Sequence, residues 1–122
     1  ALRGSSSDYK KGWGFRTTLV DNLNRNSGLR KTRLAWYIAM DLFKDGQMDL
    51  VLEEMGSVIE GLDQSYRDIG RDNHTQYFLK VHSEKIAKIL SMLGQKELLK
   101  DMKELDPDRR DIYQSALEII SK

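Results

Sequence analysis

The 122-residue sequence contains no cysteine and only one proline, and both shortages exclude whole classes of protein. Without cysteine the chain cannot carry a disulfide scaffold, a thiolate zinc site or a cysteine nucleophile. A single proline excludes collagen-like and proline-rich linker structures. No hydrophobic run approaches the roughly 20 residues needed to cross a bilayer, and the first residues lack the apolar core of a signal peptide. The sequence therefore predicts a soluble, cytoplasmic protein.

The chain has enough apolar material for one hydrophobic core. Hydrophobic residues make up 39% of the sequence and charged residues 32%, which is too apolar for a disordered tail. Apolar residues recur with helical spacing, and no segment shows the alternation that is typical of a strand. The sequence predicts an all-α fold, a single compact bundle of five to seven helices over residues 16–122. An irregular, glycine-containing arm is expected over residues 1–15.

The expected helices are 16–26, 33–44, 48–62 followed by one or two further turns, 75–93, 96–105, and one from 107 to the C-terminus. Thr32 is expected to cap the second helix, and Gly46 to end it in a left-handed conformation. Gly56 lies at the edge of an apolar stripe, where a missing side chain would let another helix approach closely. Asp106 and Pro107 are expected to open the last helix as its N-cap and its first residue.

The second expected helix has apolar residues on two sides. One stripe contains Ile38 and Leu42, and the other contains Trp36, Met40 and Phe43. A helix of this kind usually lies at the centre of a bundle, buried against several neighbours. Alternatively, one stripe is an exposed site for a partner. The sequence favours the central position and leaves the second stripe open as core or interface.

Charge is distributed unevenly along the chain although the formal net charge is only +1. The segment Lys10–Arg33, called here the basic segment, has seven cations against Asp21, whereas the segment Asp41–Asp72 has nine acids against three cations. Such segregation is typical of interaction surfaces. The alternative is that the two segments pack side by side and neutralise each other.

Aromatic rings alternate with cations at the start of the basic segment, around Trp13 and Phe15. An arm of this kind can follow a phosphate backbone while its rings stack on unpaired bases. The sequence therefore predicts a non-enzymatic helical interaction module, a regulatory or accessory subunit that binds an acidic protein or a nucleic acid, either RNA or single-stranded DNA. A homo-oligomer is a further option. The predicted binding residues are Lys10, Lys11, Trp13, Phe15, Arg16, Arg25, Arg30, Lys31 and Arg33.

Motifs for metal, phosphate or serine-hydrolase chemistry are missing from the sequence. It has no HExxH or EF-hand pattern, no GxxxxGK[ST] or GxGxxG loop, and no nucleophile elbow. His82 lies within an apolar stripe, where a histidine is usually a boundary or core residue that donates one hydrogen bond. We therefore expect no metal, no cofactor and no catalytic site of these kinds.

One short pattern does resemble an enzyme motif. Arg67 is followed by Asp68 and, after further residues, by His74 in the stretch RDIGRDNH. This stretch resembles the Arg-polar-x(4–6)-His motif of the HEPN ribonucleases, which are all-α domains of similar size. The resemblance implies that Arg67 would hold the scissile phosphate and that His74 would act on the ribose 2′-hydroxyl or its proton. Gly70 departs from the continuous helix that usually presents the motif. A HEPN-like ribonuclease is thus the alternative prediction.

Overall fold

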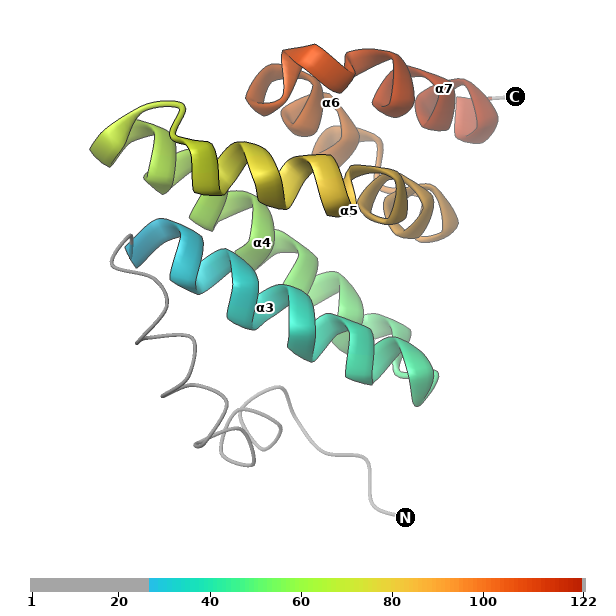
Figure 1. The fold of residues 1–122 in the computed structure, drawn as a ribbon. Helices are drawn as coiled ribbons and strands as arrows, with labels where there is room; N and C mark the ends of the chain where they lie inside the picture. Colours follow the sequence, from blue (N-terminus) through green and yellow to red (C-terminus); the bar gives the residue numbers. More distant parts are fainter. Residues whose placement is uncertain (1–26, 122) are drawn as a thin grey trace. The chain divides into compact units, whose positions relative to one another are not determined.

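The chain has two groups of helices in a computed structural model that describes residues 27–121. The helices are α3 (Ser27–Lys44), α4 (Met48–Ile69), α5 (Asn73–Met92), α6 (Lys96–Leu105), the 3₁₀ turn η1 (Pro107–Arg109) and α7 (Arg110–Ser121) (Figure 1). They form two compact units that divide between Ile69 and Gly70. No strand occurs within residues 27–121, and the all-α prediction is confirmed.

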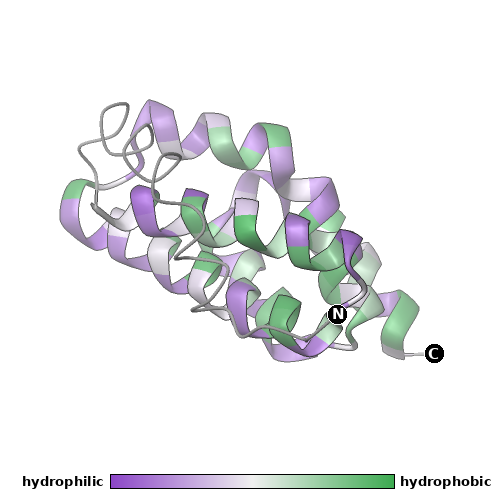
Figure 2. Cartoon of the chain, turned by 90° about the horizontal axis from the view of Figure 1, so that it is seen from below, coloured by the Kyte–Doolittle hydropathy of each residue, from purple (hydrophilic) through white to green (hydrophobic). Residues whose placement is uncertain are grey.

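Polar and apolar residues alternate along the helices, as expected for amphipathic elements (Figure 2). None of the helices within the described range is both long and apolar enough to span a membrane. The predicted arm and the predicted helix 16–26 lie outside the described residues.

Helix ends follow local sequence signals closely. Gly46 and Gly94 have φ values of 74° and 67°, which a residue with a side chain adopts only with strain. The amide of Gln47 donates to the carbonyl of Leu42 at 3.1 Å, and that of Gly46 to Phe43 at 3.1 Å, which is the Schellman pattern. The predicted end at Gly46 is therefore confirmed, as are the bounds of the helix 96–105.

Two helix limits differ from the prediction by more than one helical turn. α3 begins at Ser27, so Thr32 lies inside the helix and does not cap it. Its side chain is fully buried, and Oγ1 donates a hydrogen bond of 2.9 Å to the carbonyl of Val58 in α4. α4 continues unbroken to Ile69, so the turns expected after Leu62 belong to the same helix.

The first unit is an antiparallel pair in which α3 and α4 approach through small residues. A Cβ atom built on Gly61 would lie 2.6 Å from the carbonyl oxygen of Gly28 and would also collide with Thr32 Oγ1. A Cβ on Gly28 would lie 2.9 Å from the Cα atom of Ser65. The prediction of a close approach at Gly56 is wrong, because within residues 27–121 no atom beyond its own stretch of helix lies within 4 Å of its Cβ position. The two helices therefore touch backbone to backbone at Gly28 and Gly61.

Larger apolar residues fill the rest of this unit. α3 is buried along a broad face, and Trp36 is only 3% exposed, so the core assignment holds for that ring. Met40 and Phe43 are partly exposed. The buried apolar side chains are Leu29, Ala35, Trp36, Ile38, Ala39 and Leu42 from α3, with Val51, Met55, Val58, Ile59 and Leu62 from α4.

The second unit contains α5, α6 and α7, which contact one another. Asp72 caps α5 by accepting a hydrogen bond of 3.3 Å from the amide of Thr75. Val81 and Met92 in α5 are more than half exposed, because each lies more than about 100° around the helix from the buried Ile86. The buried apolar side chains are Phe78, Leu79, Ile86, Ala87, Ile89, Leu90, Leu99, Met102, Tyr113, Ala116 and Leu117.

Candidate anion-binding surfaces

The described part of the basic segment is the first half of α3, which contains Arg30, Lys31 and Arg33. Lys31 Nζ forms an ion pair of 2.9 Å with Glu60 Oε2 in α4. This pair joins the basic segment to the acidic one, as the neutralisation alternative predicts for one residue. The remaining predicted binding residues, Lys10, Lys11, Trp13, Phe15, Arg16 and Arg25, lie outside the described residues.

Arg30 and Arg33 occupy the face of α3 that is opposite the buried one. Their spacing with Tyr37 places all three side chains on one side of the helix. Both arginines are partly exposed, and Tyr37 is exposed. On this face the structure brings two predicted cations together with an aromatic ring. Tyr37 is not among the predicted binding residues, although its i, i+4 spacing from Arg33 could have identified it.

The HEPN-like pair does not lie on one helix. Arg67 is exposed near the end of α4, where its Nε forms an ion pair of 3.0 Å with Asp63 Oδ2 one turn earlier. α4 ends at Ile69, and Gly70 has a φ of 75°. His74 is exposed in the first turn of α5, which belongs to the second unit. The ribonuclease assignment stays a prediction.

His82 lies one turn after Phe78 in α5, and the two rings are stacked at an angle. Their centroids are 4.7 Å apart with an interplanar angle of 51°. The imidazole is partly exposed, consistent with a boundary position. Within residues 27–121 no group of three or more histidine, aspartate or glutamate side chains converges as a metal site would require.

A cationic groove runs between α6 and α7 in the second unit. It has a volume of about 650 Å³, within the usual range of ligand sites. Three cations and one acid contribute to it, together with two apolar residues. The lining residues are Lys100, Lys103, Glu104, Pro107, Arg110, Gln114, Leu117 and Ser121.

The three cationic side chains of this groove differ in the hydrogen bonds and ion pairs that they form. Lys103 Nζ donates a hydrogen bond of 2.6 Å to Gln114 Oε1, which ties α6 to α7 across the groove. Lys100 makes a longer ion pair of 3.4 Å with Glu97 on its own helix. Arg110 is exposed and forms no hydrogen bond or ion pair with any residue in the range 27–121. The N–H donors of its guanidinium are therefore not used by any side chain or carbonyl within residues 27–121.

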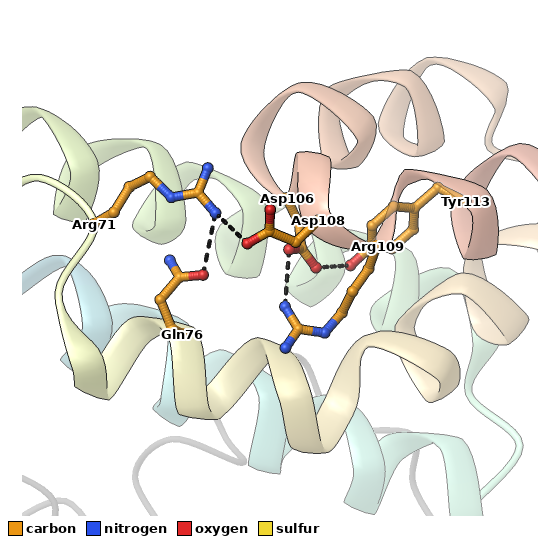
Figure 3. A network of polar contacts seen from close by, with 6 residues as sticks. All are labelled: Arg71, Gln76, Asp106, Asp108, Arg109 and Tyr113. Carbon is orange, nitrogen blue, oxygen red and sulfur yellow. Dashed lines mark hydrogen bonds and ion pairs between the residues drawn. The ribbon is translucent and has the colours of Figure 1, made fainter.

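A buried polar cluster holds η1, the turn between α6 and α7 (Figure 3). Asp106 is fully buried, and its carboxylate accepts hydrogen bonds from Tyr113 Oη at 2.7 Å and from Arg109 Nη1 at 3.0 Å. Asp106 is the N-cap of η1 and Pro107 follows it, as predicted, although the Asp106 side chain makes no capping hydrogen bond. Its carboxylate is used instead to join η1 to α7.

The exposed edge of the same turn has a second set of polar contacts. Arg71 Nη2 donates to Asp108 Oδ2 at 3.0 Å and to Gln76 Oε1 at 3.2 Å. These contacts tie η1 to the start of α5 (Figure 3). The turn that carries Pro107 and precedes Arg110, two lining residues of the groove, therefore has polar contacts on both sides.

Comparisons with known proteins identified no relative of this chain. No family model matches the chain, and the searches of the curated proteins and of the solved structures found no match.

Proposed function

We propose that the chain is a single helical bundle that works as a non-enzymatic interaction module, a regulatory or accessory subunit. Its basic segment binds an acidic protein or a nucleic acid. The observation that carries this proposal is the outward face of α3, where Arg30, Arg33 and Tyr37 continue the ring-and-cation pattern of the segment. The expected cytoplasmic location stays a prediction.

Electrostatics explains why this face suits an anionic partner. Exposed cations gain little from pairing within the fold, about 0–1 kcal/mol each, so they add little to stability. The same charges attract an anionic partner over roughly 10 Å at moderate salt. Tyr37 adds a ring that can pack on an apolar side chain or stack on a base.

The first test compares a variant that removes two positive charges from the basic segment with a control variant that removes two positive charges elsewhere. Arg30→Gln with Arg33→Gln changes the described face. The control, Lys80→Gln with Lys88→Gln, removes the same charge from exposed positions on α5. Binding to single-stranded RNA and to polyglutamate is measured by fluorescence anisotropy at low and high salt. We expect the first variant to bind about fivefold more weakly at low salt, and the difference to shrink at high salt.

A third variant applies the same binding test to the first part of the basic segment, in and next to the predicted N-terminal arm. Replacing Lys10, Lys11 and Arg16 with glutamine should weaken binding in the same way and leave the melting temperature nearly unchanged. Much earlier melting would show that these cations pair with the acidic segment, and the proposal would then be wrong.

The ribonuclease alternative makes a different prediction in the same assay. Cleavage of the RNA without added metal, abolished by His74→Ala, would favour the HEPN-like assignment. Binding without cleavage would favour the interaction module.

A further inference from the structure

We propose that the groove between α6 and α7 is a separate binding site for a short acidic peptide segment of a partner protein. This site is independent of the basic segment. Its first support is charge: Lys100, Lys103 and Arg110 face one acid, Glu104. The groove is cationic although the last fifty residues of the chain are nearly neutral.

The donors of the groove match carboxylates in number and kind. Lys103 uses one N–H on Gln114, which leaves two N–H groups for a ligand. Arg110 has no partner in the described range, and its planar guanidinium can accept a carboxylate with two parallel hydrogen bonds. The hydrogen bonds of Asp106 to Arg109 and Tyr113 hold the turn just before Arg110. The backbone position of Arg110 is therefore fixed by these contacts.

The apolar part of the groove favours a peptide over a nucleic acid. Pro107 and Leu117 line it, and the methylene stems of the two lysines add further apolar surface. No aromatic side chain is among its lining residues, so bases would have no aromatic ring on which to stack. Glu104 would also repel a continuous phosphate backbone, whereas a peptide can offer an amide N–H to it. The fitting ligand is a segment in which acidic residues flank an aliphatic one.

The site can be mapped by NMR spectroscopy, because a chain of 14.1 kDa is small enough for its amide signals to be resolved. The probe is a synthetic pentapeptide with the sequence Glu-Glu-Leu-Glu-Glu, titrated into the full ¹⁵N-labelled chain. We expect the amide signals of Lys103, Arg110 and Gln114 to shift with the peptide. A peptide with glutamine in place of each glutamate, inorganic phosphate and polyuridylate serve as comparison ligands.

A pair of variants separates this site from the basic segment. Lys100→Gln with Arg110→Gln should weaken peptide binding about fivefold at low salt, since two exposed charge contacts are lost. The control Lys80→Gln with Lys88→Gln, and the variant Arg30→Gln with Arg33→Gln, should leave the shifts at Arg110 and Gln114 unchanged. Melting curves confirm that each variant is folded.

Three outcomes would overturn the proposal. The first is peptide-induced shifts that leave α6 and α7 unaffected, and the second is unchanged affinity in the groove variant. The third is equal binding of phosphate or polyuridylate in the groove, which would assign it to phosphate groups. Failure of the basic-segment test would leave the groove proposal standing, because the two use different residues and different variants.

Discussion

The α3–α4 pair and the α5–α7 unit bury their interiors by different means. In the first, two backbones touch at Gly28 and Gly61, and the buried polar contact described there is a threonine hydroxyl on a carbonyl. In the second, large side chains fill the core, and a buried carboxylate is held by a tyrosine and an arginine. The comparison predicts that both units are sensitive to the loss of core atoms, and that the first is also sensitive to an atom added at Gly28 or Gly61.

The largest expected effect is the loss of a core side chain in the second unit. Ile89 is completely buried, so Ile89→Ala should lower the free energy of unfolding by roughly 2–5 kcal/mol. Ile119→Ala is the matched control, because that side chain is 65% exposed and its truncation should cost less than about 0.5 kcal/mol. Urea denaturation followed by circular dichroism measures both. Equal losses would mean that the assigned core face is wrong.

Adding one methyl group tests the first unit. Gly61→Ala places a Cβ against the backbone of α3, and we expect a loss of about 2–3 kcal/mol. Gly56→Ala adds the same atom to the same helix in open space, where it should stabilise by about 0.5–1 kcal/mol through the higher helix propensity of alanine. Amide hydrogen exchange in α3 and α4 reports each change locally. If both substitutions stabilise, the close approach of these helices is not real.

The smallest of the three effects concerns the polar cluster. Tyr113→Phe removes the hydroxyl that donates to Asp106, and hydrogen bonds to charged groups contribute about 1.5–3 kcal/mol. We expect a loss near the lower end, about 1.5 kcal/mol, because Arg109 still pairs with the carboxylate. Tyr77→Phe, on an exposed ring, should change stability by less than about 0.5 kcal/mol. A loss no larger in Tyr113→Phe than in Tyr77→Phe would contradict the role of the cluster.

The features that sequence reasoning predicted correctly are those set by neighbouring residues. The stop at Gly46 and the helix 96–105 depend on contacts within a few positions, and both are present. Thr32 and Gly56 were assigned wrongly because their roles depend on which face of α3 meets α4. That crossing is decided by Gly28 and Gly61, which each have a small polar residue four positions later, Thr32 and Ser65. The i, i+4 pattern is a signal that could have identified the contact.

The candidate sites show the same limit. Arg30 and Arg33 could be predicted as surface cations, because charge runs are visible in the sequence. The α6–α7 groove could not, since Lys103 and Arg110 come together only when two helices pack, and acids elsewhere in the last fifty residues balance their charge. Asp106 was correctly placed at the start of a helical turn, but its partner Tyr113 lies a further two turns along the chain.

The contact between Gly28 and Gly61 also limits how the protein can change over successive mutations. A clash between side chains can be relieved by a second mutation that trims one of them. Here the obstacle to a methyl group on Gly61 includes the carbonyl oxygen of Gly28 and the amide nitrogen of Thr32, which every amino acid possesses. Trimming the Thr32 side chain would remove only one of the three collisions. A suppressor of Gly61→Ala must therefore shift the axis of a whole helix, so positions 28 and 61 can diverge only together with the geometry of the helix pair.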